Sequence, residues 1–265
     1  MRFREVIVDP PAGKNFIVFQ KDRECIVPEP ALFITHCKAV VFIGPALSGG
    51  ILSAMKRVVV LLFLFAQPAI AIASEQVTVP PGPFTMGHPE DLLAKPERRY
   101  MLGGFSIDMF EVTNNEYAAV VPNHNIPPGA GNHPVSHVTW EEAKSFCEAA
   151  GNRLPTDAEW EKAARGNDGR SFPWGDKVRK RMPHPKFSGV VKRQPGTDKK
   201  DVSPFGVHDM AGSLWEWTAD EGEGGKIVRG GLWNLHLNFE FSKTWQKNII
   251  PPEERFSFLG FRCAK

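Results

Sequence analysis

The sequence lacks the features that would assign it at once to several large function classes. Its formal net charge is only +2 over 265 residues, so nothing in the overall charge favours nucleic acid as a partner. It has no G-x-x-x-x-G-K-[ST] phosphate loop and no G-x-S-x-G nucleophile motif. No internal repeat of fixed period is visible. With 42% hydrophobic residues, the chain suits one globular domain with additional segments.

A long membrane-spanning run is also missing. The apolar residues 58–66 are too few, and too soon interrupted by Gln67 and Pro68, to cross a bilayer comfortably. They follow a basic pair at 56–57 and precede a small-x-small triplet at 71–73, which is the order of a secretory signal peptide. The pattern therefore predicts a signal peptide over residues 55–73, beginning at Met55.

A signal peptide belongs at the start of a chain, so we interpret residues 1–54 as upstream sequence with no role in the product. Cleavage before Ser74 would leave a secreted or periplasmic domain, residues 74–265, with no stable membrane span. The alternative is a genuine N-terminal extension, in which case residues 58–66 would serve as a membrane anchor.

Cysteine is scarce. Cys25 and Cys37 precede the predicted cleavage point, so the predicted domain keeps only Cys147 and Cys263. Two cysteines in an exported domain indicate one disulfide. Two unpaired buried thiols are the alternative.

The most informative stretch that is present runs from 203 to 217 and reads SPFGVHDMAGSLWEW. Its two glycines permit tight turns, and its two tryptophans are large anchors, so we expect an irregular loop rather than a helix or strand. Asp209 and Glu216 flank Gly212, and carboxylates beside turning backbone carbonyls suit a hard cation such as Ca²⁺. A buried structural loop without a ligand is the alternative.

The patterns in the rest of the sequence predict short helices and short strands, separated by long stretches of irregular backbone. Three capping boxes, at 113–116, 139–142 and 156–159, each predict a helix start. The second helix should end at Gly151 and the third at Gly166. We expect strands and loops in the following ranges: an edge strand and hairpin at 77–86, a loop at 87–100, a half-buried strand at 104–112, irregular backbone at 167–202, and short strands at 227–231, 233–237 and 258–264.

Five motifs in this order resemble the sulfatase-modifying-factor, or formylglycine-generating-enzyme, family over residues 77–265. They are PVSHVTWEEAKSFCEAAGNRLPTDAEWEKAARG, FPWG, SPFGVHDMAGSLWEW, VRGGLW and GFRCA. The resemblance implies a single α+β domain, a loop-rich variant of the C-type-lectin-like fold. It also implies a disulfide between Cys147 and Cys263.

The family's best-known activity is the oxidation of a sulfatase cysteine to formylglycine, with oxygen and with copper bound by a cysteine pair. A gap-free count from Gly230 places that pair at Glu240 and Trp245, and no cysteine occurs between Cys147 and Cys263. A carboxylate and an indole cannot replace the thiolates that bind Cu(I). We therefore expect neither copper nor the family's oxidation chemistry in this chain.

The family also binds calcium. Carried over to the stretch 203–217, its ligands are the Asp209 and Glu216 side chains and the Gly212 and Leu214 carbonyls. The segment after FPWG offers no match to a second calcium site of the family.

Two function classes follow. The first is an exported, non-catalytic protein that binds a protein partner or assists its maturation, with calcium as a structural ion. The second is an enzyme whose chemistry needs no cysteine, in a pocket near Trp215, His236 and Glu240. Bound redox metal would favour the enzyme, and calcium alone the accessory protein. The pair His133 and His137 lacks a third ligand and is interpreted as structural or solvated.

Overall fold

The computed structural model describes residues 4–8, 16–20, 74–94, 96–179, 194–231 and 242–265. It divides into two units, Met1–Pro68 and Ala69–Lys265, which are taken separately. In the first unit, strand β1 (Arg4–Val8) pairs antiparallel with β2 (Phe16–Gln20). None of the helices in the described residues has the length and apolar character needed to cross a membrane.

Three short helices begin where the capping boxes predict. They are α1 (Asn114–Val120), α2 (Trp140–Ala149) and α3 (Asp157–Arg165). In each, the N-cap threonine side chain accepts from the backbone of the third helical residue, a glutamate, whose carboxylate accepts from the threonine N–H. Helix α3 ends at Gly166, which has a positive φ of 73°. The three predicted starts and this stop are confirmed.

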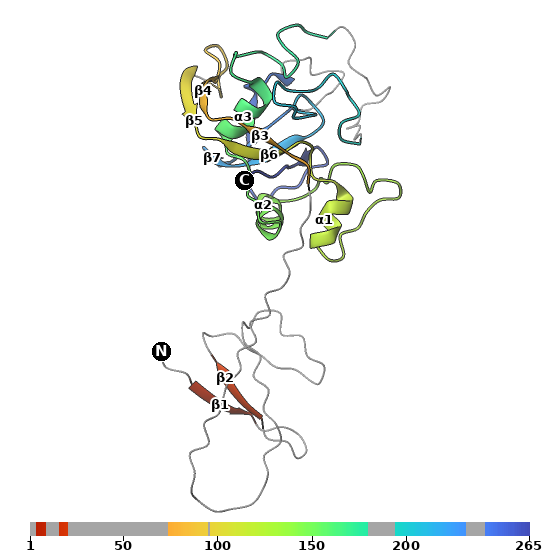
Figure 1. Cartoon of the computed structure of the whole chain (residues 1–265). Coiled ribbons are helices and arrows are strands. Elements are labelled where there is room, and N and C mark those ends of the chain that lie inside the picture. The colour runs from red at the N-terminus through yellow and green to blue at the C-terminus, as the bar shows by residue number, and fades with distance from the viewer. Residues whose placement is uncertain (1–3, 9–15, 21–73, 95, 180–193, 232–241) are drawn as a thin grey trace, which may run out of the picture. The chain divides into compact units, whose positions relative to one another are not determined.

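In the second unit, the described strands form one four-stranded sheet and two small pairs. Figure 1 labels β3 to β7 of this unit. The larger sheet has the order β10-β7-β8-β9, and β10 runs parallel to β7 while the other pairs are antiparallel. Its members are β7 (Trp215–Gly222), β8 (Gly225–Arg229), β9 (Lys247–Ile250) and β10 (Leu259–Gly260). The pairs are β3 (Gln76–Val79) with β6 (Phe105–Asp108) and β4 (Gly82–Met86) with β5 (Arg98–Leu102).

Four predictions of strands and loops were wrong in part. The strand expected at 104–112 ends at Asp108, as β6. Residues 77–86 form no hairpin, because β3 and β4 take different partners that lie farther along the chain. The end of the expected loop at 87–100 begins strand β5. The end of the stretch 203–217 begins strand β7, although we expected loop there. The strand expected at 233–237 lies outside the described residues.

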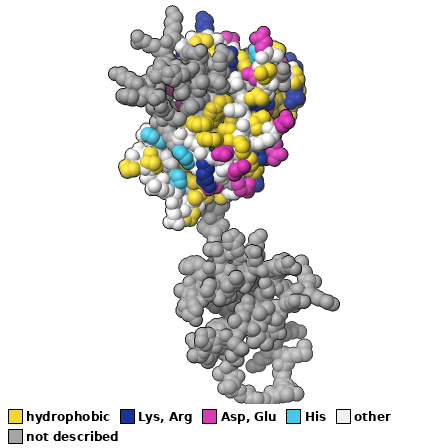
Figure 2. Space-filling model, turned by 180° about the vertical axis from the view of Figure 1, so that it is seen from behind, with side chains coloured by type: hydrophobic (Ala, Val, Ile, Leu, Met, Phe, Trp, Pro, Cys, Tyr) yellow, Lys and Arg dark blue, Asp and Glu magenta, His cyan; other side chains and the backbone are white. Residues whose placement is uncertain are grey.

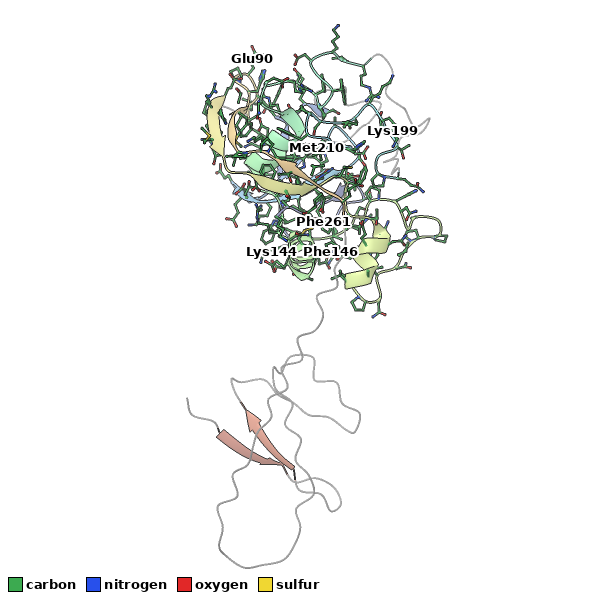
Figure 3. All side chains as sticks on the ribbon, viewed as in Figure 1. Glu90, Lys144, Phe146, Lys199, Met210 and Phe261 are labelled. Carbon is green, nitrogen blue, oxygen red and sulfur yellow. A yellow bond between two sulfur atoms is a disulfide. The ribbon has the colours of Figure 1, made fainter. Side chains whose placement is uncertain are left out.

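The core of the domain joins the helices to the sheet. Phe146 of α2 packs edge-on against Phe261, with ring centroids 5.4 Å apart, and Tyr117 of α1 stacks on Phe146 (Figure 3). A second cluster, which contains Met210, gathers around Trp160 of α3. Both clusters border the segment 203–217, so this segment lies at the centre of the fold.

Candidate functional site

The stretch 203–217 folds back on itself before it enters β7. The Ser203 N–H donates to the Val207 carbonyl, and the Gly206 N–H donates to the Ser203 carbonyl. Gly206 has a φ of 88°, which a residue with a side chain rarely adopts. The turn directs Val207 and Met210 into the core, where both are fully buried.

Asp209 lies at the tightest point of this stretch. Its backbone is left-handed, with a φ of 59°, and its side chain is buried. One carboxylate oxygen accepts from the Gly196 N–H, and the other accepts no hydrogen bond from the described residues. Burial raises the pKa of Asp209 to about 6, against the lowering effect of the Gly196 N–H and Arg262. Among the described residues, no donor therefore occupies the second oxygen of Asp209.

Glu216 lies nearby, but its carboxylate is already occupied. Arg262 binds it bidentately, with Nη2 at 2.7 Å from Oε1 and Nε at 2.7 Å from Oε2. The Trp160 indole N–H donates to Oε2 as well, at 2.8 Å. Glu216 and Arg262 are both completely buried. In this arrangement Glu216 does not fit as a calcium ligand, although the family resemblance implies that role.

The two predicted carbonyl ligands lie between these carboxylates along the chain. Gly212 has a φ of 120°, so a side chain would be strained there. The Leu214 carbonyl packs closely under Gly230, since a Cβ on Gly230 would lie 2.7 Å from it. The Leu214 N–H donates to Glu111 Oε1 at 3.1 Å, and the Ser213 hydroxyl donates to Glu111 Oε2 at 2.8 Å.

Glu111 is a buried carboxylate of this site that the sequence reasoning missed. Burial, together with the negative charges of Glu216 and Asp209, raises the pKa of Glu111 well above its usual value. We had assigned the residue to the end of a strand. Glu111 lies two residues before the N-cap residue Thr113, and no local pattern in the sequence marks it as buried.

Within the described ranges, no group of three or more histidine, cysteine, aspartate or glutamate side chains is arranged to hold a metal ion. A calcium ion at this loop would take most of its six to eight oxygens from carbonyls and water. Asp209 fits such a site and Glu216 does not. The assignment of Asp209, Gly212, Leu214 and Glu216 as calcium ligands stays a prediction.

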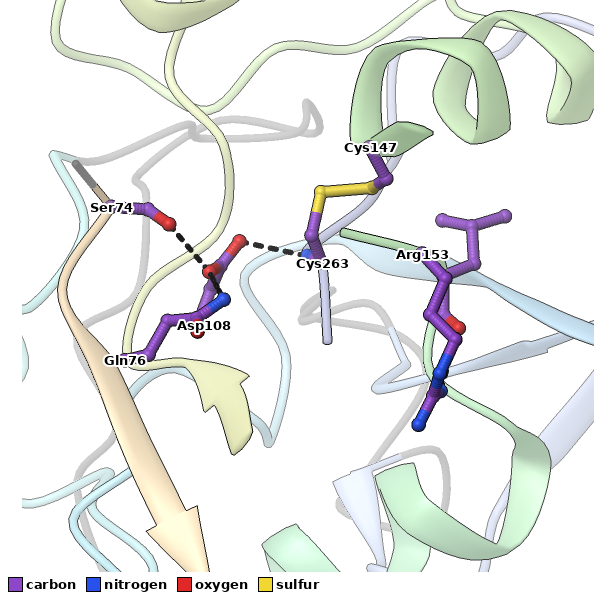
Figure 4. Close-up of a disulfide and its surroundings, with 7 residues drawn as sticks. Ser74, Gln76, Asp108, Cys147, Arg153 and Cys263 are labelled. Carbon is purple, nitrogen blue, oxygen red and sulfur yellow. Dashed lines mark hydrogen bonds between the residues drawn. A yellow bond between two sulfur atoms is a disulfide. The ribbon is translucent and has the colours of Figure 1, made fainter. Parts of the chain in front are cut away.

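The structure joins Cys147 to Cys263, the pair that the family resemblance implies (Figure 4). Their Cα atoms are 5.6 Å apart, and the bond links α2 to the segment after β10. Beside it, Asp108 accepts from the Cys263 N–H, from the Ser74 hydroxyl at 2.6 Å and from the Gln76 amide. Burial raises the pKa of Asp108 despite these bonds.

The remaining residues that the sequence analysis singled out are the tryptophans Trp215 and Trp245, His236 and Glu240. Trp215 is buried in the core, and His236 and Glu240 lie outside the described residues. Trp245 is buried, and its ring stacks on His88 with centroids 4.2 Å apart.

His133 and His137 line a pocket of about 670 Å³ beside α1 and α2. Histidine side chains also gather on the face drawn in Figure 2. His124 is a third histidine of the pocket and contacts Asn114 Oδ1 at 3.0 Å. The rim includes Arg255, which binds Glu142 through two contacts of 2.6 Å. The structure thus brings the predicted histidine pair to a common polar pocket.

Several known proteins are similar in sequence to this chain. Over 291 aligned residues the chain is 26% identical to the formylglycine-generating enzyme of Mus musculus, covering 76% of this chain and 77% of the relative. Over 163 residues it is 34% identical to the inactive C-alpha-formylglycine-generating enzyme 2 of Bos taurus, covering 52% of this chain and 53% of the relative.

Solved structures share the fold. PvdO from Pseudomonas aeruginosa superposes with a TM-score of 0.56 at 23% identity, covering 71% of this chain and 93% of that one. Variable protein 1 of Treponema denticola gives the same TM-score at 20% identity, with 71% and 94% covered. Residues 65–265 match the sulfatase-modifying factor enzyme 1-like domain. The chain therefore belongs to the sulfatase-modifying factor family of formylglycine-generating-enzyme-like proteins.

Proposed function

We propose that this protein is an exported, non-catalytic member of the family that binds a protein partner or assists its maturation. One observation carries the proposal. The predicted domain has only two cysteines, and the structure joins them to each other, so no thiolate is left to bind Cu(I). The similar protein of Bos taurus is named an inactive formylglycine-generating enzyme, so its name also supports a non-catalytic role.

The loss of oxidation chemistry is directly testable. The purified protein, incubated with a sulfatase-type cysteine peptide and oxygen, is expected to form no formylglycine, with or without added copper. Mass spectrometry measures the aldehyde and the loss of the peptide thiol. A family member that retains the cysteine pair serves as the positive control. Copper-stimulated conversion of the peptide by this protein would refute the non-catalytic proposal.

Export is the second part of the proposal. The pattern over residues 55–73 supports it, and the Ser74 hydroxyl bonds to Asp108 inside the domain, so a chain that starts at Ser74 keeps this contact. Protein recovered from a secreting host is expected to begin at Ser74 by N-terminal sequencing. Recovery of an exported chain that still carries residues 1–54 would contradict this start.

We further propose calcium as a structural ion of the loop around Asp209. Two observations support this: one Asp209 oxygen accepts no hydrogen bond from the described residues, and the positive φ of Gly212 permits a tight turn. When bound, the cation would neutralise buried carboxylates and hold the loop against the sheet. The chain's own residues supply the rest of the loop's order, through the hydrogen bonds of Ser203 and Glu111.

A further inference from the structure

The pocket beside α1 and α2 that His133 and His137 line is not used by the proposed function. Its volume of about 670 Å³ falls in the range of about 300–1,000 Å³ that is usual for small-molecule sites. None of its lining residues belongs to the stretch 203–217, or to the positions 230–245 at which the family's cysteine pair was sought. The pocket is therefore a separate candidate binding site.

Tyr117 of α1 lines this pocket although only 3% of its surface is exposed. Its ring is fixed, because it stacks on Phe146 and meets Phe261 and His124 edge-on. No described residue forms a hydrogen bond with its hydroxyl, although a buried tyrosine hydroxyl usually has a partner. Burial and the negative charge of Glu142 raise the pKa of Tyr117 to about 12, so the hydroxyl keeps its proton and can donate it to a ligand.

His124 supplies an acceptor beside this donor. The Asn114 amide nitrogen donates to the carbonyls of Ala130 at 2.9 Å and His133 at 3.1 Å, so Asn114 Oδ1 is an acceptor. His124 Nε2 lies 3.0 Å from that oxygen and must therefore carry the proton. Burial lowers the pKa of His124, which favours the neutral ring. In that ring Nδ1 has no proton, and no described residue donates to it.

The charged groups of the pocket neutralise each other. Arg255 binds both oxygens of Glu142 at 2.6 Å, and it also donates to the His137 carbonyl. Among the described residues that line the pocket, there is no other lysine, arginine, aspartate or glutamate. A charged ligand would therefore find no unpaired side chain of opposite charge from these residue types. Apolar surface comes from Val121, Pro127, Ala130 and Val138.

We propose that this pocket binds a neutral sugar through the Tyr117 hydroxyl and His124 Nδ1. The two rings are neighbours, with centroids 4.9 Å apart, so a single small molecule can reach both groups. Hydroxyl groups on adjacent carbons suit them, because one can accept from the tyrosine while the next donates to the imidazole. The C–H faces of the sugar would pack on the apolar surface. This inference goes beyond the proposed function and does not depend on it.

The experiment tests glucose, galactose and mannose against the full chain at neutral pH by saturation-transfer NMR, with the Kd from titration. At least one sugar is expected to bind. The matching uronate should bind at least tenfold more weakly, because its carboxylate finds no unpaired positive charge. Tyr117→Phe should weaken the Kd of the neutral sugar about fivefold, the effect of one lost hydrogen bond. This variant should melt no lower than wild type, since no described residue bonds to the hydroxyl.

Tyr100→Phe is the matched control. Tyr100 is the other of the two tyrosines in the chain and lies in strand β5, outside the pocket, so its variant should keep the wild-type Kd. The proposal is overturned if none of the three sugars binds. It is also overturned if Tyr117→Phe binds the sugar as tightly as wild type, which would place the sugar elsewhere. Tighter binding of the uronate than of the neutral sugar would show an anion site instead.

Discussion

Reduction of the Cys147–Cys263 bond is expected to lower the free energy of unfolding by about 5 kcal/mol. The two residues are 116 positions apart, so the bond closes a long loop and restricts the unfolded chain strongly. Native domains are stabilised by only about 5–15 kcal/mol in total. Loss of the bond therefore removes a large part of the stability, and urea denaturation of the oxidised and reduced protein measures it.

Two controls accompany this measurement. Cys147→Ala with Cys263→Ala should reproduce most of the loss without a reductant, plus a smaller effect from the missing sulfur atoms in the core. Thiol labelling of native, unreduced protein should find no free cysteine after residue 73. Two reactive thiols, or equal stability of the oxidised and reduced forms, would refute the cross-link.

The second large effect is expected from Arg262→Met, which should destabilise the protein by about 3–5 kcal/mol. Both partners of the pair are completely buried, so the change leaves the Glu216 charge without a counter-ion. Arg262 also donates to the carbonyls of Asp108, Met109 and His208, which would lose these bonds. Equilibrium denaturation of the variant measures the loss.

Arg255→Met is the matched control. Arg255 also binds Glu142 bidentately, through Nη1 and Nη2, but the two side chains are 49% and 37% exposed. Water can solvate the remaining partner there, so the expected loss is about 0–1 kcal/mol. Similar losses in both variants would show that burial does not govern the Arg262 pair. Adding Glu216→Leu to Arg262→Met should recover part of the stability, because no lone charge then remains.

The features that could be predicted from the sequence were those encoded locally. Thr113, Thr139 and Thr156 mark their helices because the capping partners lie three residues away. Strand β7 escaped prediction although Glu216 and Thr218 alternate with Trp215 and Trp217, because the glycines just before it indicated an irregular loop. Strand β5 escaped because it is charged and largely exposed at a sheet edge.

The site was predictable only in its general position. Asp209 was singled out because a carboxylate in a glycine-containing turn is visible in the sequence. The pairing of Glu216 with Arg262 depends on β10 lying parallel to β7, which no local pattern reveals. The approach of Asp201 to the turn at 209–211 likewise depends on how the preceding loop closes. Contacts between residues far apart in the sequence therefore determine which carboxylates accept hydrogen bonds from arginine or from the backbone.

The segment 259–265 has a consequence for the timing of folding. It supplies β10, Arg262 and Cys263, and Ala264 forms bridges to both Ile107 and Arg153. The ribosome makes this segment after every residue that it contacts. A nascent chain that stops short of it has an unpaired Cys147, an uncompensated Glu216 and an exposed edge on β7. Complete folding of the domain must therefore follow the synthesis of this segment.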